Sequence, residues 1–117
     1  MKRRIIQTTD FEADVLDLIS KRKLIKEDFE NFKKSLVENP EQGDLIPGTG
    51  GIRKTRLKSA SKGKRGGFRV CYLDLEDRLI LFLLFIYGKN VQENLTPAEK
   101  MELKQLAMTL KKEGRHE

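Results

Sequence analysis

The side chains of this sequence best suited to chemistry are cations gathered in one segment. Between Leu45 and Leu73 the sequence carries eight Lys or Arg residues and no Asp or Glu, whereas the whole protein is only +6. The remaining residues together sum to −2 (+6 less the segment's +8), so the basic charge is a local patch. Lys and Arg stabilise negative charge on phosphate oxygens, and each neutralised phosphate releases condensed counterions. The patch favours a polyanion as the partner, and a solvated basic loop is the competing interpretation.

Other kinds of active site are disfavoured by what the sequence lacks. The only histidine, His116, is the penultimate residue, which argues against a Ser/His or Cys/His nucleophile. The single cysteine, Cys71, excludes an internal disulfide and a cysteine-based zinc site. No His and carboxylate spacing resembles a metal site, and no phosphate-binding glycine motif is present, although Gly48, Gly50 and Gly51 superficially resemble one. We therefore expect neither a metal nor a cofactor.

A small α+β domain is predicted to position these cations. Apolar residues at helical spacing predict two amphipathic helices whose aromatic residues, Phe11, Phe29 and Phe32, belong to the core. Two capping-box signatures mark helix starts, at Thr9 with Glu12 and at Thr96 with Glu99. The expected elements are a strand at 3–8, helices from Thr9 to the basic junction at 21–23 and from Lys26 to Glu38, strands at 52–58, 68–75 and 79–87, and a helix from 97.

The strand patterns predict how the sheet is covered. Residues 68–75 alternate in a way that fits a half-buried strand, whereas residues 79–87 are apolar on both faces, as expected of a central strand. Residues 76–77 supply a tight turn, and residues 59–67 form a loop without core-forming side chains. The expected order is β-α-α-β-β-β-α in a single domain over residues 1–117, with a twisted antiparallel sheet flanked by helices.

The composition also predicts where the protein acts. The longest apolar run, residues 79–87, is far shorter than the roughly 20 residues that span a bilayer, and the basic N-terminus lacks the apolar segment of a signal peptide. A single cysteine is typical of a reducing compartment. We therefore expect a cytoplasmic protein without membrane association.

Three motifs occur in order: GTGGIRKTR at 48–56, SKGKRGGFRVCY at 61–72 and FIYGKN at 85–90. Together they closely resemble toxins of bacterial toxin–antitoxin pairs in the RelE/ParE superfamily, with the HigB type nearest. The resemblance runs along nearly the whole chain. It implies a compact RelE-like fold whose sheet cradles mRNA in the ribosomal decoding site. It also implies a cognate antitoxin, commonly one with a helix-turn-helix segment.

The reaction that the resemblance implies is ribosome-dependent, metal-independent cleavage of mRNA, in which a ribose 2′-OH attacks the adjacent phosphate. The family's site residues are basic, and the matching positions are Lys54, Arg56, Arg69 and Lys89. Lys54 and Arg56 alternate on one strand, so both side chains would contact the same RNA segment. Arg69 follows the Gly-aromatic pair at 67–68, and Lys89 follows the Tyr-Gly pair at 87–88.

The sequence departs from the family pattern at two points. Asn90 stands where RelE itself has an arginine, and no tyrosine follows Lys89, although RelE carries a functional one in its final helical region. Tyr87 or Tyr72 would have to replace it, although neither lies at the motif position.

The chemistry of the cations is compatible with this match. A lysine beside other cations loses its proton more readily, which makes Lys54, flanked by Arg53 and Arg56, the candidate general base. Arg69 would clamp the scissile phosphate bidentately. Plain phosphate binding by the same residues is the alternative. The residues expected to bind RNA or the ribosome are Arg53, Lys58, Lys62, Lys64, Arg65, Tyr87 and Asn90.

Some of these positions have more than one interpretation. Arg53 lies on the opposite strand face from Lys54, as a solvated or ribosomal-RNA contact, and Tyr87 either closes the core or stacks on a base. Lys62, Lys64 and Arg65 are expected to dock on the ribosome. Two other functions compete with mRNA cleavage: a gyrase-directed toxin of the ParE type, and a non-catalytic module that binds RNA or the ribosome.

Overall fold

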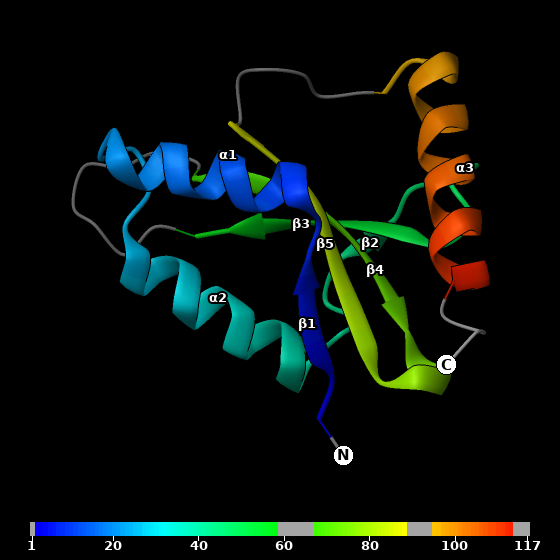
Figure 1. Ribbon diagram of the computed structural model, residues 1–117, viewed down its shortest axis with the longest axis horizontal. Coiled ribbons are helices and arrows are strands. Elements are labelled where there is room, and N and C mark those ends of the chain that lie inside the picture. Colours follow the sequence, from blue (N-terminus) through cyan, green and yellow to red (C-terminus); the bar gives the residue numbers. More distant parts are fainter. Residues whose placement is uncertain (1, 59–66, 89–94, 114–117) are drawn as a thin grey trace.

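The computed structural model describes residues 2–58, 67–88 and 95–113 of the 117-residue chain (Figure 1). Three helices and a five-stranded sheet confirm the predicted α+β fold. In chain order the elements are β1 (Arg4–Gln7), α1 (Thr9–Ser20), α2 (Lys26–Glu38), β2 (Asp44–Leu45), β3 (Ile52–Leu57), β4 (Phe68–Leu75), the 3-10 turn η1 (Glu76–Arg78), β5 (Ile80–Gly88) and α3 (Pro97–Glu113).

The strands of the sheet lie in the order β1-β5-β4-β3-β2. As predicted, β3, β4 and β5 form an antiparallel meander. Two features were not predicted: β1 pairs with β5 in parallel, and the two-residue strand β2 pairs with β3. Because β1 lies against β5, the most apolar strand becomes an interior strand, as its composition requires.

Helices cover both faces of the sheet and divide the core into two clusters. Figure 1 shows α1 and α2 to the left of the sheet and α3 to its right. The first cluster joins α1 and α2 to residues such as Val70 and Leu83, and the predicted core aromatics Phe11, Phe29 and Phe32 are all buried in it. The second joins Leu103 and Ala107 of α3 to the opposite face of the sheet.

The second cluster corrects the prediction of a half-buried β4. Cys71 and Leu73 are only 2% and 1% exposed, because α3 covers the face on which they lie. The alternation of the strand is confirmed, since Val70 and Tyr72 belong to the cluster on the opposite face. The same packing leaves the beginning of β4 less covered, where Phe68 and Arg69 are only partly buried.

The helix starts are decided by specific hydrogen bonds. The capping box predicted for α3 is confirmed, because Thr96 N donates to Glu99 Oε1 at 2.8 Å and Glu99 N donates to Thr96 Oγ1 at 3.1 Å. The box predicted at Thr9 is wrong: Thr8 is the N-cap of α1, and its Oγ1 accepts from Phe11 N at 3.2 Å. The chain leaves β1 at Gln7, so the helix begins one residue earlier than its sequence signature suggests.

In the part of the chain that the structure describes, no helix is long and apolar enough to cross a bilayer.

Candidate nucleic-acid interface

Two rows of side chains cross the sheet and bring four of the predicted site residues, Lys54, Arg56, Arg69 and Tyr87, to one face. In the first row Arg56 of β3 pairs with Arg69 of β4, which pairs with Tyr87 of β5. In the second row Lys54 pairs with Cys71, which pairs with Phe85. Directly paired residues point to the same side of a sheet, so all six side chains share one face. Cys71 belongs to the cluster around α3, which identifies that face as the one α3 partly covers.

Among the described residues, α3 covers Cys71 and packs beside Tyr87, but it leaves Lys54, Arg56, Arg69 and Phe85 partly or fully exposed. Its buried residues, Leu103 and Ala107, pack with Ile52 and Leu73, which lie at the other ends of β3 and β4. Along β3 the side chains become more exposed with distance from α3, because Ile52 is fully buried, Lys54 is partly buried and Arg56 is exposed. We call the six side chains of the two rows the open face.

A β-bulge in β5 brings Phe85 and Tyr87 onto this face. The register shifts between Cys71 and Tyr72, so that Cys71 pairs with Phe85 and Tyr72 pairs with Leu83. Leu84 is the extra residue of the bulge and lies buried beside α3. A strand without the bulge would keep Leu83 on the same face as Tyr87, whereas Leu83 packs with α1 and α2 instead.

A glycine immediately before β4 allows the close approach of β3 and β4 beside Arg69. Gly67 has φ +58°, and a Cβ at this position would collide with the carbonyl oxygen of Leu57 at the end of β3. Close approach of the two backbones therefore requires glycine here. This gives a structural reason for the Gly-aromatic-Arg motif, since Arg69 lies two residues beyond Gly67 and pairs with Arg56.

Tyr87 is held in place by Cys71. The two side chains are joined by a hydrogen bond, and Tyr87 also packs against the cluster around α3. Burial raises the pKa of the Tyr87 phenol to about 12, and the neighbouring Cys71 adds to the rise while Arg69 opposes it. Burial likewise raises the pKa of the Cys71 thiol to about 11, against the opposing effect of Lys54. Both groups are therefore protonated at neutral pH, and the packing of Tyr87 agrees with core closure, one of its two predicted roles.

Tyr72 and Arg53 lie on the other face of the sheet. The Tyr72 side chain is fully buried, its hydroxyl donates to Pro40 O at 2.7 Å, and it accepts from Gly43 N at 2.9 Å. Tyr72 therefore cannot replace the missing family tyrosine at the open face. Arg53 faces away from Lys54, as predicted, and Arg53 Nη1 donates to Gly43 O at 2.7 Å. It thus fastens the segment before β2 to β3.

The glycine-rich loop before β3 approaches α3. Thr49 is fully buried, and its Oγ1 donates to Ile46 O at 2.7 Å and accepts from Ile52 N at 3.2 Å. Lys111 of α3 donates to Gly50 O at 2.7 Å. The loop is thus hydrogen-bonded to the first residue of β3 through Thr49 and to α3 through Lys111.

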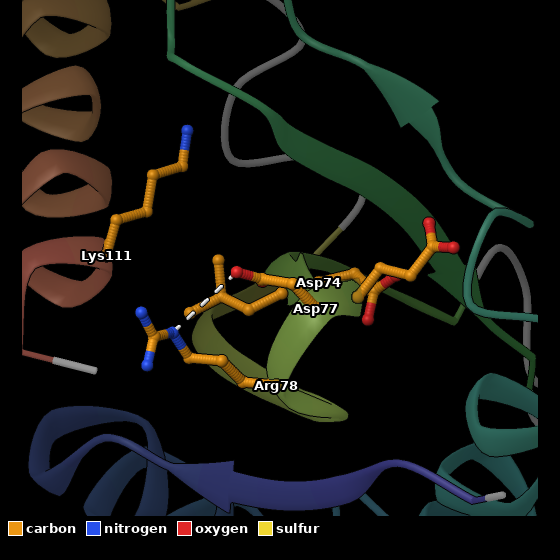
Figure 2. Close-up of a pocket in the computed structure, with 6 residues that line it drawn as sticks. Asp74, Asp77, Arg78 and Lys111 are labelled. Atoms are coloured by element: carbon orange, nitrogen blue, oxygen red, sulfur yellow. Dashed lines mark ion pairs between the residues drawn. The ribbon is translucent and has the colours of Figure 1, made fainter. Parts of the chain in front are cut away.

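A hollow of about 480 Å³ lies away from the open face, between the turn at η1 and the end of α3. Figure 2 shows Lys111 extending from α3 on one side, with Asp77 and Arg78 on the other. Arg78 Nε and Asp77 Oδ2 are 3.9 Å apart, while Asp74 accepts a bidentate pair of bonds from Arg3. The carboxylates that line this hollow would repel a polyanion. Among the described residues, no group of three or more His, Cys, Asp or Glu is placed to hold a metal ion.

The remaining six predicted residues lie at the end of a described segment or outside the described residues. Lys58 is exposed just beyond the end of β3. Five others lie outside the described residues, namely Lys62, Lys64, Arg65, Lys89 and Asn90. Their predicted roles stay predictions.

Sequence reasoning missed Phe85, which belongs to the open face. The apolar run at 79–87 predicted a strand covered on both sides, yet Phe85 is 40% exposed. A signal was present, because Phe85 precedes Tyr87 by two residues and strand alternation places such residues on one face.

A family model described as "RelE toxin of RelE / RelB toxin-antitoxin system" matches residues 4–117 of the chain. The match extends from the first residue of β1 through the whole of α3, so it includes every strand and helix that forms or borders the open face.

Proposed function

This chain belongs to the RelE toxin family of toxin–antitoxin systems, and on that premise we propose that it is a ribosome-dependent endoribonuclease. It cleaves mRNA in the cytoplasm by attack of a ribose 2′-OH on the adjacent phosphate, and it thereby arrests translation. The new bond from the 2′-oxygen to phosphorus replaces the bond to the 5′-oxygen, so the products are a 2′,3′-cyclic phosphate and a 5′-OH, and the proton lost by the 2′-OH is balanced by the one that the 5′-oxygen gains. An antitoxin is its partner within the toxin–antitoxin system, and we propose one of the helix-turn-helix type. The HigB-like subtype likewise stays a prediction.

The observation that carries this proposal is the open face with its three cations. Lys54, Arg56 and Arg69 come from two paired strands and lie on one side of the sheet. Cleavage by a 2′-OH places extra negative charge on the phosphate oxygens, and fixed cations around that phosphate stabilise this charge. A rigid sheet holds their Cα positions before the substrate arrives, which lowers the cost of ordering them.

We assign separate tasks to the cations of the open face. Arg69 binds the scissile phosphate through its planar guanidinium, a geometry that lysine does not offer. Arg56, in the neighbouring position, binds the same phosphate or the next one along the chain. Lys54, one row away, acts as the general base on the 2′-OH. Lys89 completes the cationic set under this proposal.

The experiment that tests this function maps mRNA 5′ ends after expression of the protein, with and without translating ribosomes. We expect new 5′ ends within translated codons, and their loss in Lys54→Ala and Arg69→Ala variants that keep the wild-type circular dichroism spectrum. Lys34→Ala serves as the matched control, because Lys34 is an exposed lysine on α2, whose buried side chains belong to the opposite cluster.

Each alternative outcome has a distinct meaning. DNA damage without new mRNA ends would identify a gyrase-directed toxin. Ribosome binding without cleavage would identify a non-catalytic module. Cleavage that survives in a well-expressed Lys54→Ala, Arg69→Ala double variant would overturn the assignment of the open face.

A further inference from the structure

The aromatic residue of the open face that is accessible to a ligand is Phe85. Among the aromatic side chains that the structure describes, Phe85 is the exposed one, with 40% of its surface accessible. Tyr87, two residues later, is partly buried against the cluster around α3 and hydrogen-bonded to Cys71. The ring free to receive a planar partner is therefore that of Phe85.

The surroundings of Phe85 indicate what that partner is. Phe85 is in register with Cys71, which is in register with Lys54, and the neighbouring row supplies Arg56 and Arg69. The cations beside the ring favour an anionic partner over an apolar protein segment. A nucleotide fits both features, because its phosphate is attracted by the cations and its base has a flat face that stacks on an aromatic ring.

The described backbone accounts for the exposure of Phe85. The parallel pairing of β1 with β5 ends at Leu83, so β1 does not flank β5 beside Phe85. The bulge turns Leu84 into the core and leaves Phe85 outside it. Among the described residues no strand pairs with β5 on this side of Phe85, so the ring lies at the rim of the described sheet.

We propose that Phe85 is a specificity-determining residue that stacks on a nucleobase of the bound RNA, one or two nucleotides from the phosphate held by Arg56 and Arg69. This inference rests on the proposed ribonuclease function. Stacking accepts every base, because each has a π-face, but purines offer the larger surface. Phe85 therefore favours a purine at one position next to the cleaved bond.

The test measures single-turnover cleavage of a defined mRNA bound to ribosomes by the full-length protein. Phe85→Ala and Phe85→Leu should each slow cleavage at subsaturating protein by roughly 10-fold or more, whereas Phe85→Trp should retain the wild-type rate. Leucine keeps the apolar character and removes the π-face, so it separates stacking from a general apolar contact. Leu16→Ala is the control, since Leu16 is 62% exposed on α1 and lies away from the open face.

A second arm changes the RNA instead of the protein. An abasic nucleotide is placed in turn at each position near the cleaved bond. At one position it should slow the wild-type protein as much as Phe85→Ala does, and it should slow the Phe85→Ala variant no further. Such non-additivity is expected when the base and the ring contact each other.

The possible failures are distinguishable. If the wild-type protein cleaves and Phe85→Ala cleaves equally well, or if the two changes are additive at every position, the stacking role is overturned and the ribonuclease function stands. If Phe85→Ala and Phe85→Leu spare cleavage and only weaken neutralisation by the antitoxin, the ring is a protein contact. If the wild-type protein does not cleave, the ribonuclease function fails, and the stacking role fails with it.

Discussion

Arg56 on β3 and Arg69 on β4 are directly paired across two antiparallel strands, so two residues of like charge face the same side of the sheet. Directly opposite residues have Cβ atoms about 4.5–5.5 Å apart, and like charges at that separation destabilise a sheet. A pair of this kind is suited to hold an anion between two guanidinium groups. A phosphate bound between them would offset the repulsion expected of two like charges.

The first prediction follows from that repulsion. Arg56→Thr should raise the free energy of unfolding by about 0.2–1 kcal/mol, because it removes one of two paired like charges and places a β-branched residue in a strand. The same variant should lower mRNA cleavage by roughly 100-fold, as expected for a lost charge-stabilising group. Urea unfolding and single-turnover cleavage measure the two effects.

Added salt and a conservative variant serve as controls for this prediction. The stability gain should shrink as salt screens the repulsion, and Arg56→Lys should show no comparable gain because it keeps the charge. A lower unfolding midpoint for Arg56→Thr than for the wild-type protein in low salt would contradict this account.

The second prediction separates the two tyrosines. Tyr72→Phe should lower the free energy of unfolding by about 1–3 kcal/mol, because Gly43 N and Pro40 O lose their hydroxyl partner in a buried site. Its toxicity should persist at temperatures where the variant stays folded, since Tyr72 lies on the face opposite the cations. Urea unfolding and growth assays over a temperature range provide the measurements, and a variant of wild-type stability would speak against the buried bonds.

The third prediction concerns the start of α1. Thr8→Ala should cost about 1 kcal/mol of stability, because Thr8 Oγ1 satisfies the otherwise unpaired N–H of Phe11. Thr9→Ala is the matched control and should change stability little, since Thr9 is exposed inside the helix. Chemical unfolding of the two variants measures the difference, and equal losses would place the cap at the wrong threonine.

The fourth prediction is alkaline sensitivity around Tyr87. The pKa values of Cys71 and Tyr87 are raised from 9.0 and 10.0 to about 11 and about 12, so both groups hold their protons more tightly in the native protein. The stability that this contributes is present in full below the unfolded pKa values and is lost as the pH rises through about 11 and 12. Unfolding midpoints measured from neutral to alkaline pH should therefore decrease as the pH rises from the unfolded pKa values of 9.0 and 10.0 to about 11 and about 12.

Thiol reactivity gives an independent reading of the same environment. The native Cys71 thiol should resist alkylation at neutral pH, because it is buried and protonated, and it should react readily in denaturant. In Cys71→Ala the unfolding midpoint should decrease less between neutral and alkaline pH than it does in the wild-type protein. Rapid alkylation of the native protein would show that the thiol is more accessible than its 2% exposure implies.

Local patterns in the sequence predicted the elements well, because they depend on neighbouring residues. The bounds of α2 and β4 agree with the expected residues, and the reciprocal bonds of Thr96 and Glu99 follow their four-residue signature. Strand alternation also placed Lys54 and Arg56 on one face, with Arg53 on the other. These features need no knowledge of what packs from a distance.

Features that depend on distant contacts were not predictable in the same way. The parallel pairing of β1 with β5 joins residues from opposite ends of the sequence, and the cover over Cys71 comes from α3. The bulge at Leu84 depends on which residues the two clusters accept, so the apolar run of β5 did not reveal that Phe85 is exposed. Tyr72 illustrates the same limit, because its hydroxyl bonds backbone groups near residue 40.

The pairing of β1 with β5 has a consequence for the timing of synthesis. Arg4 is in register with Ile80, and the cluster that holds α1 and α2 includes Leu81, Leu83 and Ile86 of β5. The sheet therefore cannot assemble until β5 has left the ribosomal exit tunnel, when most of the chain has been translated. The open face of a nascent chain is therefore incomplete until β5, which carries Phe85 and Tyr87, has emerged.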